Sequence, residues 1–130
     1  MALIHWLIFA GVTFVSFFPF QWLFYTFIRN AHEKTVWGHE FSSSLMYFLV
    51  CAVIINVTMV LPNSLSFYVG GIAYHDWFKS AWVLHITYAA VNLGGAVAIL
   101  WIQFGELPTK GALAGLLLMV TGSLISVFWK

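Results

Sequence analysis

Long apolar stretches alternate along this chain with short polar breaks. A helix that crosses a membrane needs about 20 mainly apolar residues to span a hydrocarbon core of roughly 30 Å. Four stretches qualify, and they cover residues 3–28, 43–61, 80–104 and 109–129. The pattern predicts an all-α fold, an integral membrane bundle of four transmembrane helices that forms one domain over residues 1–130.

Three connections join the predicted helices. Residues 30–42 are polar, whereas residues 63–79 are only half polar and hold an apolar run too short to cross a membrane. The second helix is expected to end before Pro62, so residues 63–79 are expected to form an interfacial or re-entrant segment. The last connection, residues 105–110, is short enough for a tight hairpin.

Pro19 lies inside the first apolar stretch. A proline removes a backbone hydrogen bond and clashes with the preceding turn, so a kink is expected near residues 17–20. The carbonyl group freed by the proline is expected to be satisfied by Ser16 or by a neighbouring helix.

Composition agrees with a membrane setting. Hydrophobic residues make up 62% of the 130 residues and charged residues only 7%, against about 25% charged in an ordinary soluble domain. The formal net charge of +1 and the absence of a basic stretch argue against a nucleic-acid partner. Cys51 is the only cysteine, which excludes a disulfide within the chain. Membrane lipids are the expected surroundings, in a plasma or inner membrane.

The fourth apolar stretch carries small residues on one face. Gly111, Gly115, Gly122 and Ser126 fall on a single stripe of the predicted helix. Small residues let helix backbones approach closely in lipid, where there is little hydrophobic force between helices. The stripe predicts either a dimer seam or a contact with another helix of the same chain.

The closing hairpin resembles that of the drug/metabolite transporter superfamily. Those proteins end a helix in a Phe-Gly-Glu-like turn, here residues 104–106, and then carry two glycines seven positions apart, here Gly115 and Gly122. The similarity covers residues 93–126, and the four-helix size is similar to that of the small multidrug resistance branch and of lipid-sugar translocase subunits. The resemblance implies a small transporter that works as an oligomer.

The chain departs from that family in its first helix. The small multidrug exporters exchange protons for drug through a first-helix glutamate, but residues 3–28 hold no carboxylate. Glu106 lies in the hairpin turn and is not a substitute. A carrier without proton coupling of its own is therefore expected.

Three polar residues are predicted at membrane depth: Asn56, His85 and Asn92. A polar side chain there is costly, so each is expected to have a partner or a role. They are predicted to line a transport path or, alternatively, to hydrogen-bond between helices. His85 and Asn92 are seven positions apart and therefore lie on nearly the same helix face.

The loop of residues 31–40 contains two His-Glu pairs. His32 and His39 are candidate metal ligands because imidazole and carboxylate suit Zn, Cu or Fe. Their spacing matches no strong metal signature, and the alternative is a solvated loop beside lipid headgroups. No metal or other cofactor is predicted, and no enzyme signature such as GxSxG or a P-loop is present.

Two functional hypotheses follow. The first is a transporter or flippase subunit for an amphipathic small molecule or a lipid-linked substrate, acting as a homo- or hetero-oligomer. The second is a non-catalytic accessory subunit of a larger membrane complex of respiratory, photosynthetic or monooxygenase type.

Overall fold

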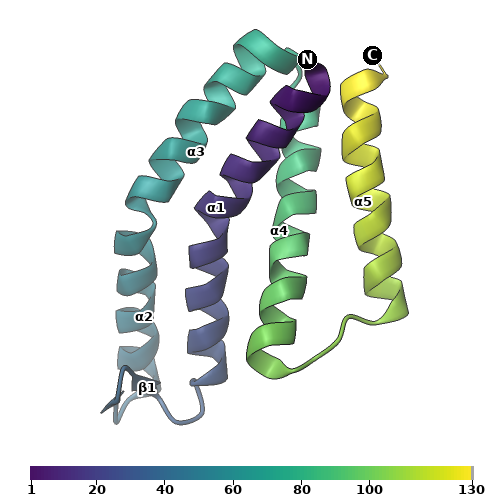
Figure 1. Ribbon diagram of the computed structural model, residues 1–130. Helices are drawn as coiled ribbons and strands as arrows, with labels where there is room; N and C mark the ends of the chain where they lie inside the picture. The colour runs from purple at the N-terminus through teal and green to yellow at the C-terminus, as the bar shows by residue number, and fades with distance from the viewer. Residues whose placement is uncertain (130) are drawn as a thin grey trace.

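The computed structural model describes residues 1–129 and is mostly helical. Its helices run alternately up and down, side by side (Figure 1). They are α1 (Ala2–Arg29), α2 (Ser44–Thr58), α3 (Val60–Ile72), the π-helical segment η1 (Ala73–Phe78), α4 (Ala81–Phe104) and α5 (Lys110–Phe128). A small antiparallel hairpin, β1 (Thr35–Val36) with β2 (His39–Glu40), lies between α1 and α2. The all-α prediction is confirmed.

Three of the predicted helices agree with the structure to within a residue or two: α1, α4 and α5. Each is long and apolar enough to cross a membrane. The closing hairpin has clear ends, because Gly105 terminates α4 with φ of 68° and the Thr109 hydroxyl accepts a hydrogen bond from the Ala112 amide at 3.1 Å. These are the usual glycine and threonine caps of helices.

The structure corrects the bounds of the second predicted helix and shows that the connection after it is helical, which leaves a re-entrant segment compatible with it. The α-helix breaks at Met59, before the predicted end, and α3 and η1 make most of residues 63–79 helical. Pro62 lies in the first turn of α3, where the missing backbone N–H removes no helical hydrogen bond. The proline therefore helps to begin a helix instead of marking the end of one.

The chain bends by 46° at the junction of α2 with α3. Figure 1 shows that α3 runs on in the same general direction as α2. The described residues thus hold three helices long and apolar enough to cross a membrane, or four spans if the bent pair is one span.

Helix α1 is continuous through Pro19 and changes direction near its middle (Figure 1). A proline in a helix interior commonly produces such a bend. The Ser16 hydroxyl is buried and has no hydrogen-bond partner among the described residues. Of the two expected partners of the freed carbonyl, Ser16 is therefore wrong, and a partner from a neighbouring helix stays a prediction.

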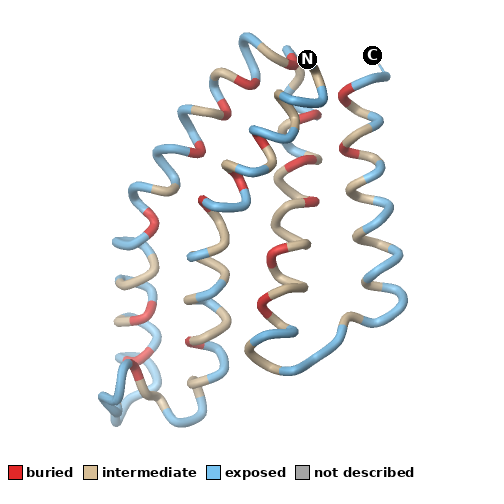
Figure 2. The backbone as a smooth tube through the Cα atoms, viewed as in Figure 1, coloured by how far each residue is buried: buried red, intermediate tan, exposed pale blue. Residues whose placement is uncertain are grey.

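Two clusters of buried hydrophobic residues lie towards opposite ends of α1, and further buried positions run along α4 (Figure 2). The first consists of Phe9, Ala73, Phe78, Val83 and Val127, and joins α1 to η1, α4 and α5. The second consists of Phe27, Val36, Tyr47 and Cys51, where the Tyr47 hydroxyl donates a hydrogen bond to the Phe27 carbonyl.

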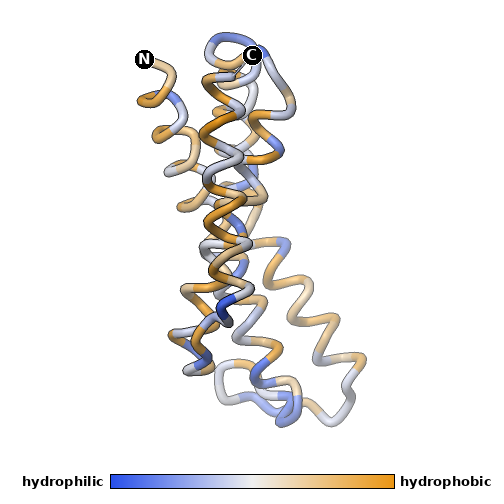
Figure 3. Tube along the Cα trace, turned by 90° about the vertical axis from the view of Figure 1, so that its right-hand side faces the viewer, coloured by the Kyte–Doolittle hydropathy of each residue, from blue (hydrophilic) through white to orange (hydrophobic). Residues whose placement is uncertain are grey.

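The outer surfaces of the helices are apolar. Figure 3 shows hydrophobic residues along the helices, with hydrophilic stretches at the loops and at scattered positions. Large side chains such as Phe67, Leu118 and Val57 are more than two-thirds exposed. Soluble proteins rarely expose so large a continuous apolar surface, and these apolar helices are compatible with a membrane protein.

Candidate functional site

Polar side chains connect α1 to its neighbours at three levels. Near the start of α1, the Trp6 indole N–H donates to Ser123 Oγ at 2.9 Å and to Thr87 Oγ1 at 3.2 Å. Thr87 and Ser123 are fully buried, and their hydroxyl oxygens lie 2.8 Å apart. This network links α1, α4 and α5 and satisfies polar groups that an apolar surrounding would otherwise penalise.

The second level lies near the middle of the interface between α1 and α4. The Gln21 side-chain amide donates to the Asn92 carbonyl at 2.8 Å. Gly95 makes room for Gln21, since a Cβ atom at Gly95 would lie 2.5 Å from Gln21 Oε1. A glycine is needed here because the two helices approach closely around a polar side chain.

The third level lies at the far end of the same interface. Gln103 donates to Thr26 Oγ1 at 2.8 Å and to the Trp22 carbonyl at 3.1 Å. Arg29 donates to the Gln103 carbonyl at 3.4 Å. All three levels hold helices together, and none of them surrounds an open space.

An open groove of ≈ 630 Å³ lies between α1, α3 and α4. Helix α3 contributes Asn63, Ser66, Phe67 and Gly70, α4 contributes Leu84, Tyr88 and Asn92, and α1 contributes Phe17. We call this space the α3–α4 groove. Its volume lies within the range of roughly 300–1,000 Å³ that is usual for small-molecule sites.

Tyr88 holds the two sides of the groove together. Its hydroxyl lies 3.1 Å from the hydroxyl of Ser66, which is buried in α3. Gly70 faces the same hydroxyl, and a Cβ atom at Gly70 would lie 3.1 Å from it. The Tyr88 ring packs edge-on against Phe9 and Phe17 of α1. Three helices therefore position one phenol group at the groove.

Asn92 lies one helical turn beyond Tyr88 on α4 and also lines the groove. Its Oδ1 atom is buried and has no hydrogen-bond partner among the described residues. A buried carboxamide oxygen without a partner costs free energy on the order of 1–3 kcal/mol. This oxygen lies beneath the surface of the groove and has almost no accessible area of its own.

A second hollow of ≈ 540 Å³ adjoins the groove and shares Leu84 and Tyr88 with it. Its other lining residues are Tyr74, Ala81, Trp82 and His85. His85 and Asn92 therefore lie on the same side of α4, towards adjoining spaces, as their spacing of seven residues predicts. No Asp, Glu, Lys or Arg side chain lines either hollow beside His85.

The structure does not bring Asn56 together with His85 and Asn92. It is exposed on α2, and its side-chain amide donates to the Ala52 carbonyl of its own helix at 2.8 Å. A path-lining role for Asn56, His85 and Asn92 stays a prediction, and the structure places only His85 and Asn92 near the groove.

Sequence reasoning missed Ser66, Gly70 and Tyr88. Ser66 and Gly70 were assigned to a non-spanning connection, and a tyrosine in an apolar stretch stands out little. Once α3 is known to be a helix, Ser66 and Gly70 form a pair of small residues four positions apart. Such a pair marks a helix face that another helix can approach closely.

Within residues 1–129, the two central glycines of the α5 stripe, Gly115 and Gly122, have open space around them. A Cβ atom at Gly115 or Gly122 would have no atom within 4 Å, and one at Gly111 would meet only Thr109 of its own turn. Ser126 donates its hydroxyl proton to the Ser123 carbonyl within α5. Helix α5 instead buries Ser123 and Val127 against the rest of the bundle. A side chain at Gly115 or Gly122 would thus begin in open space, and the choice between a dimer seam and a contact within the chain stays a prediction.

His32 and His39 lie in the hairpin loop between α1 and α2. His39 is exposed and packs edge-on against Phe41, with ring centroids 4.7 Å apart. Within residues 1–129 there is no group of three His, Cys, Asp or Glu side chains placed to hold a metal ion. The loop has a polar hollow of ≈ 420 Å³, lined by His32, Glu33, Lys34, Thr35, Glu40 and Phe41.

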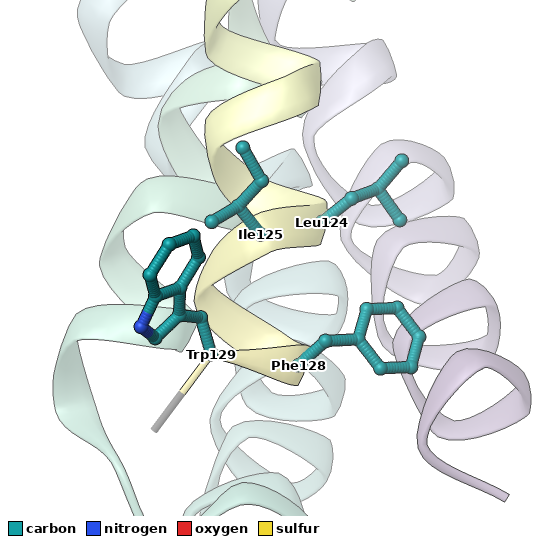
Figure 4. Close-up of a pocket in the computed structure, with 4 residues that line it drawn as sticks. All are labelled: Leu124, Ile125, Phe128 and Trp129. Carbon is teal, nitrogen blue, oxygen red and sulfur yellow. The ribbon is translucent and has the colours of Figure 1, made fainter.

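A further hollow lies at the end of α5 (Figure 4). Its lining residues Leu124, Ile125, Phe128 and Trp129 all come from this single helix, and their side chains spread away from it. No second element closes the space. This hollow is an irregularity of an apolar helix surface and offers no site for chemistry.

Comparison with protein-family models, with curated proteins and with solved structures found no match to the chain. The functional argument therefore depends on the geometry of the chain itself.

Proposed function

We propose that the chain is an integral membrane protein of a cell membrane, plasma or inner, with four spans. Helices α1, α4 and α5 would each cross the bilayer, and the bent pair of α2 with α3 and η1 would cross as the remaining span. The length and apolar character of these helices support this topology. The exposed apolar side chains of the bundle would then face lipid, and the loop of residues 30–42 would lie at one membrane surface.

Within that membrane the protein acts as a dimeric transporter or flippase subunit for an amphipathic molecule. The observation that carries this proposal is the α3–α4 groove, which combines apolar walls with neutral polar groups at Ser66, Tyr88 and Asn92. The groove is open at the side of the bundle, because Phe67 on its rim is 85% exposed. A molecule dissolved in the bilayer can enter it laterally.

The dimer is formed through α5. Gly115 and Gly122 have open space in front of them, and small residues favour close helix packing in lipid. The resemblance of the closing hairpin to the drug/metabolite transporter superfamily supports the same arrangement. No carboxylate lines the groove, so the carrier is uncoupled or takes its coupling from a partner.

Reconstitution into vesicles tests this function. Vesicles that contain the purified protein should move a fluorescently labelled amphiphile between leaflets faster than protein-free vesicles. The Gly115→Leu variant should lose this activity together with the dimer. Equal rates in vesicles with and without the protein would contradict the proposal.

An accessory role in a larger membrane complex is the second candidate. The observation that favours it is the extent of exposed aromatic and aliphatic surface on α3, where Phe67 and Tyr68 are both exposed. Such a surface suits contact with other subunits as well as with lipid. Extraction in gentle detergent followed by native mass measurement separates the candidates, since a stoichiometric hetero-assembly would replace the dimer.

A further inference from the structure

The hairpin between α1 and α2 carries a tryptophan at its tip. Strands β1 and β2 pair Val36 with His39, so Trp37 and Gly38 form a two-residue turn between them. Both turn residues have a positive φ, 47° at Trp37 and 85° at Gly38, which is the pattern of a type I′ turn. The Trp37 side chain is 79% exposed.

Tryptophan is unusual in such a turn. Type I′ turns strongly prefer Asn, Asp and Gly, because the left-handed backbone disfavours bulky side chains. A strained residue persists where the surrounding structure holds it, and such residues gather at functional sites. The hairpin is held in this way, since Val36 is buried and the Phe41 backbone N–H donates to the Lys34 carbonyl at 2.9 Å. The fold therefore presents Trp37 on a fixed support, against the preference of the turn.

The packing of Val36 sets the level of the hairpin along the helices. Val36 is buried against Phe27 in the last turn of α1 and Tyr47 in the first turn of α2. The hairpin consequently lies beside the ends of these helices, as Figure 1 shows at the lower end of α2. Exposed apolar side chains, which would face lipid, begin on α2 at Leu45. Trp37 is thus placed where the apolar helix surface meets the polar loop.

The charges near Trp37 do not favour attraction to an anionic surface. Lys34 is the only Lys or Arg in residues 31–42, whereas Glu33 and Glu40 are acidic. An indole needs no such attraction, because its ring is apolar, its N–H is polar, and the headgroup level of a bilayer accommodates both. The partner that fits the tip of the hairpin is therefore a lipid headgroup layer of any charge.

We infer that Trp37 is a lipid anchor, and that the β1–β2 hairpin lies on the bilayer surface with the Trp37 indole embedded at headgroup level. The anchor fixes the depth at which α1 ends and α2 begins, because Val36 joins the hairpin to both helices. This role rests on the membrane setting proposed above and is independent of transport.

The intact indole is tested with the full chain in nanodiscs, which leave both membrane faces accessible. The emission lost in Trp37→Phe reports Trp37 among the seven tryptophans. Phosphatidylcholine brominated at the headgroup end of its acyl chains should quench most of this difference emission, and acrylamide in the water should quench little of it. Added phosphatidylglycerol should change neither result.

Three results of this measurement would overturn the inference. Quenching by acrylamide without quenching by the brominated lipid would place Trp37 in water. Protection from both quenchers would place it against protein. Quenching by the brominated lipid only when phosphatidylglycerol is present would replace the anchor by a charge contact.

Cleavage by trypsin after Lys34, also in nanodiscs, separates an anchor from an effect on the turn alone. Asn suits the turn better than Trp, so relief of strain by Trp37→Asn would slow cleavage. Loss of the anchor should instead make cleavage at least about tenfold faster than in the wild type. Trp37→Tyr keeps an interfacial aromatic side chain and should retain the wild-type rate. Equal or slower cleavage in Trp37→Asn would overturn the inference.

The membrane setting has its own control in the quenching assay. Leu118 is exposed near the middle of α5, so the emission gained in Leu118→Trp should be quenched by lipid brominated near the ends of its acyl chains. If this emission is quenched as expected while Trp37 is reached only by acrylamide, the membrane setting stands and the anchor fails. If acrylamide alone quenches the tryptophan at position 118, the proposed membrane setting fails and the anchor fails with it.

Discussion

The hydroxyl oxygens of Thr87 and Ser123 lie 2.8 Å apart in the interface of α4 with α5, where neither residue is exposed to solvent. Both accept from the indole N–H of Trp6, so one donor on α1 is shared between two acceptors on different helices. This arrangement fixes the rotation of α5 about its axis, because Ser123 must face α1 and α4. Gly115 and Gly122 consequently lie to one side of this contact, where a Cβ atom would have no neighbour within 4 Å.

Removal of either hydroxyl should destabilise the bundle. Ser123→Ala and Thr87→Val each break bonds of this network, and a loss of about 0.6 kcal/mol, with an upper value near 1.7 kcal/mol, is expected for a hydrogen bond between membrane helices. Thermal unfolding in detergent measures the loss. Thr58→Val is the matched control, since Thr58 bonds only to carbonyl groups of its own helix. The network has no stabilising role if all three variants unfold at the wild-type temperature.

Substitution by alanine should destabilise the protein more at Gly95 than at the neighbouring Gly94. A Cβ atom at Gly95 would meet Gln21 Oε1 at 2.5 Å, whereas one at Gly94 would meet Leu116 Cδ1 at an ordinary 3.9 Å. Gly95→Ala must displace Gln21 from the Asn92 carbonyl, and we expect it to be less stable than Gly94→Ala by about 1 kcal/mol. Denaturant unfolding of both variants measures this difference.

A second substitution at Gln21 checks the cause of that difference. Gln21→Ala removes the atom that the new methyl group would meet. In that background Gly95→Ala should be no more costly than Gly94→Ala. A penalty that persists in the Gln21→Ala background would mean that another contact of Gly95 is responsible.

Substitution of the α5 glycines should affect the dimer and leave the monomer intact. Gly115→Leu and Gly122→Leu add side chains into open space, so the monomer should unfold at its normal temperature. A dimer held by this stripe should dissociate about tenfold more readily or more, because the backbones can no longer approach. Analytical ultracentrifugation in detergent measures the dissociation constant. Ala114→Leu, which lies on a different face of α5, is the control, and an unchanged dimer in Gly115→Leu would rule out the stripe as the seam.

Substitution of Gly105 should destabilise the turn of the closing hairpin. This residue ends α4 in the left-handed region with φ of 68°, which disfavours an L side chain by roughly 1–2 kcal/mol. Gly105→Ala should lower the free energy of unfolding by about that amount. Gly11→Ala adds a methyl group to the interior of α1 with no atom within 4 Å, and it should be neutral or stabilising. Similar unfolding curves for the two variants would contradict this account of the turn.

The helices predicted from the sequence agree with the structure in some parts of the chain and differ from it in others. Residues 3–28, 80–104 and 109–129 were predicted as helices and are confirmed, because a long apolar run can satisfy its backbone groups only within itself. Pro62 misled the interpretation of the second stretch, because a proline is compatible with the first turn of a helix as well as with a helix end. The local sequence does not distinguish these two cases.

The sequence by itself determined the long helices, the tight closing turn and the helix face that carries the glycines. Each of these depends on the spacing of nearby residues and on helix caps within a few residues. The tertiary structure alone decided that Ser66 meets Tyr88, that Asn92 Oδ1 remains without a partner, and that a Cβ atom at Gly115 or Gly122 would have open space around it. These relationships join segments far apart in the chain. They depend on the bend between α2 and α3 and on the rotation of each helix about its axis, which the packing of the whole bundle sets.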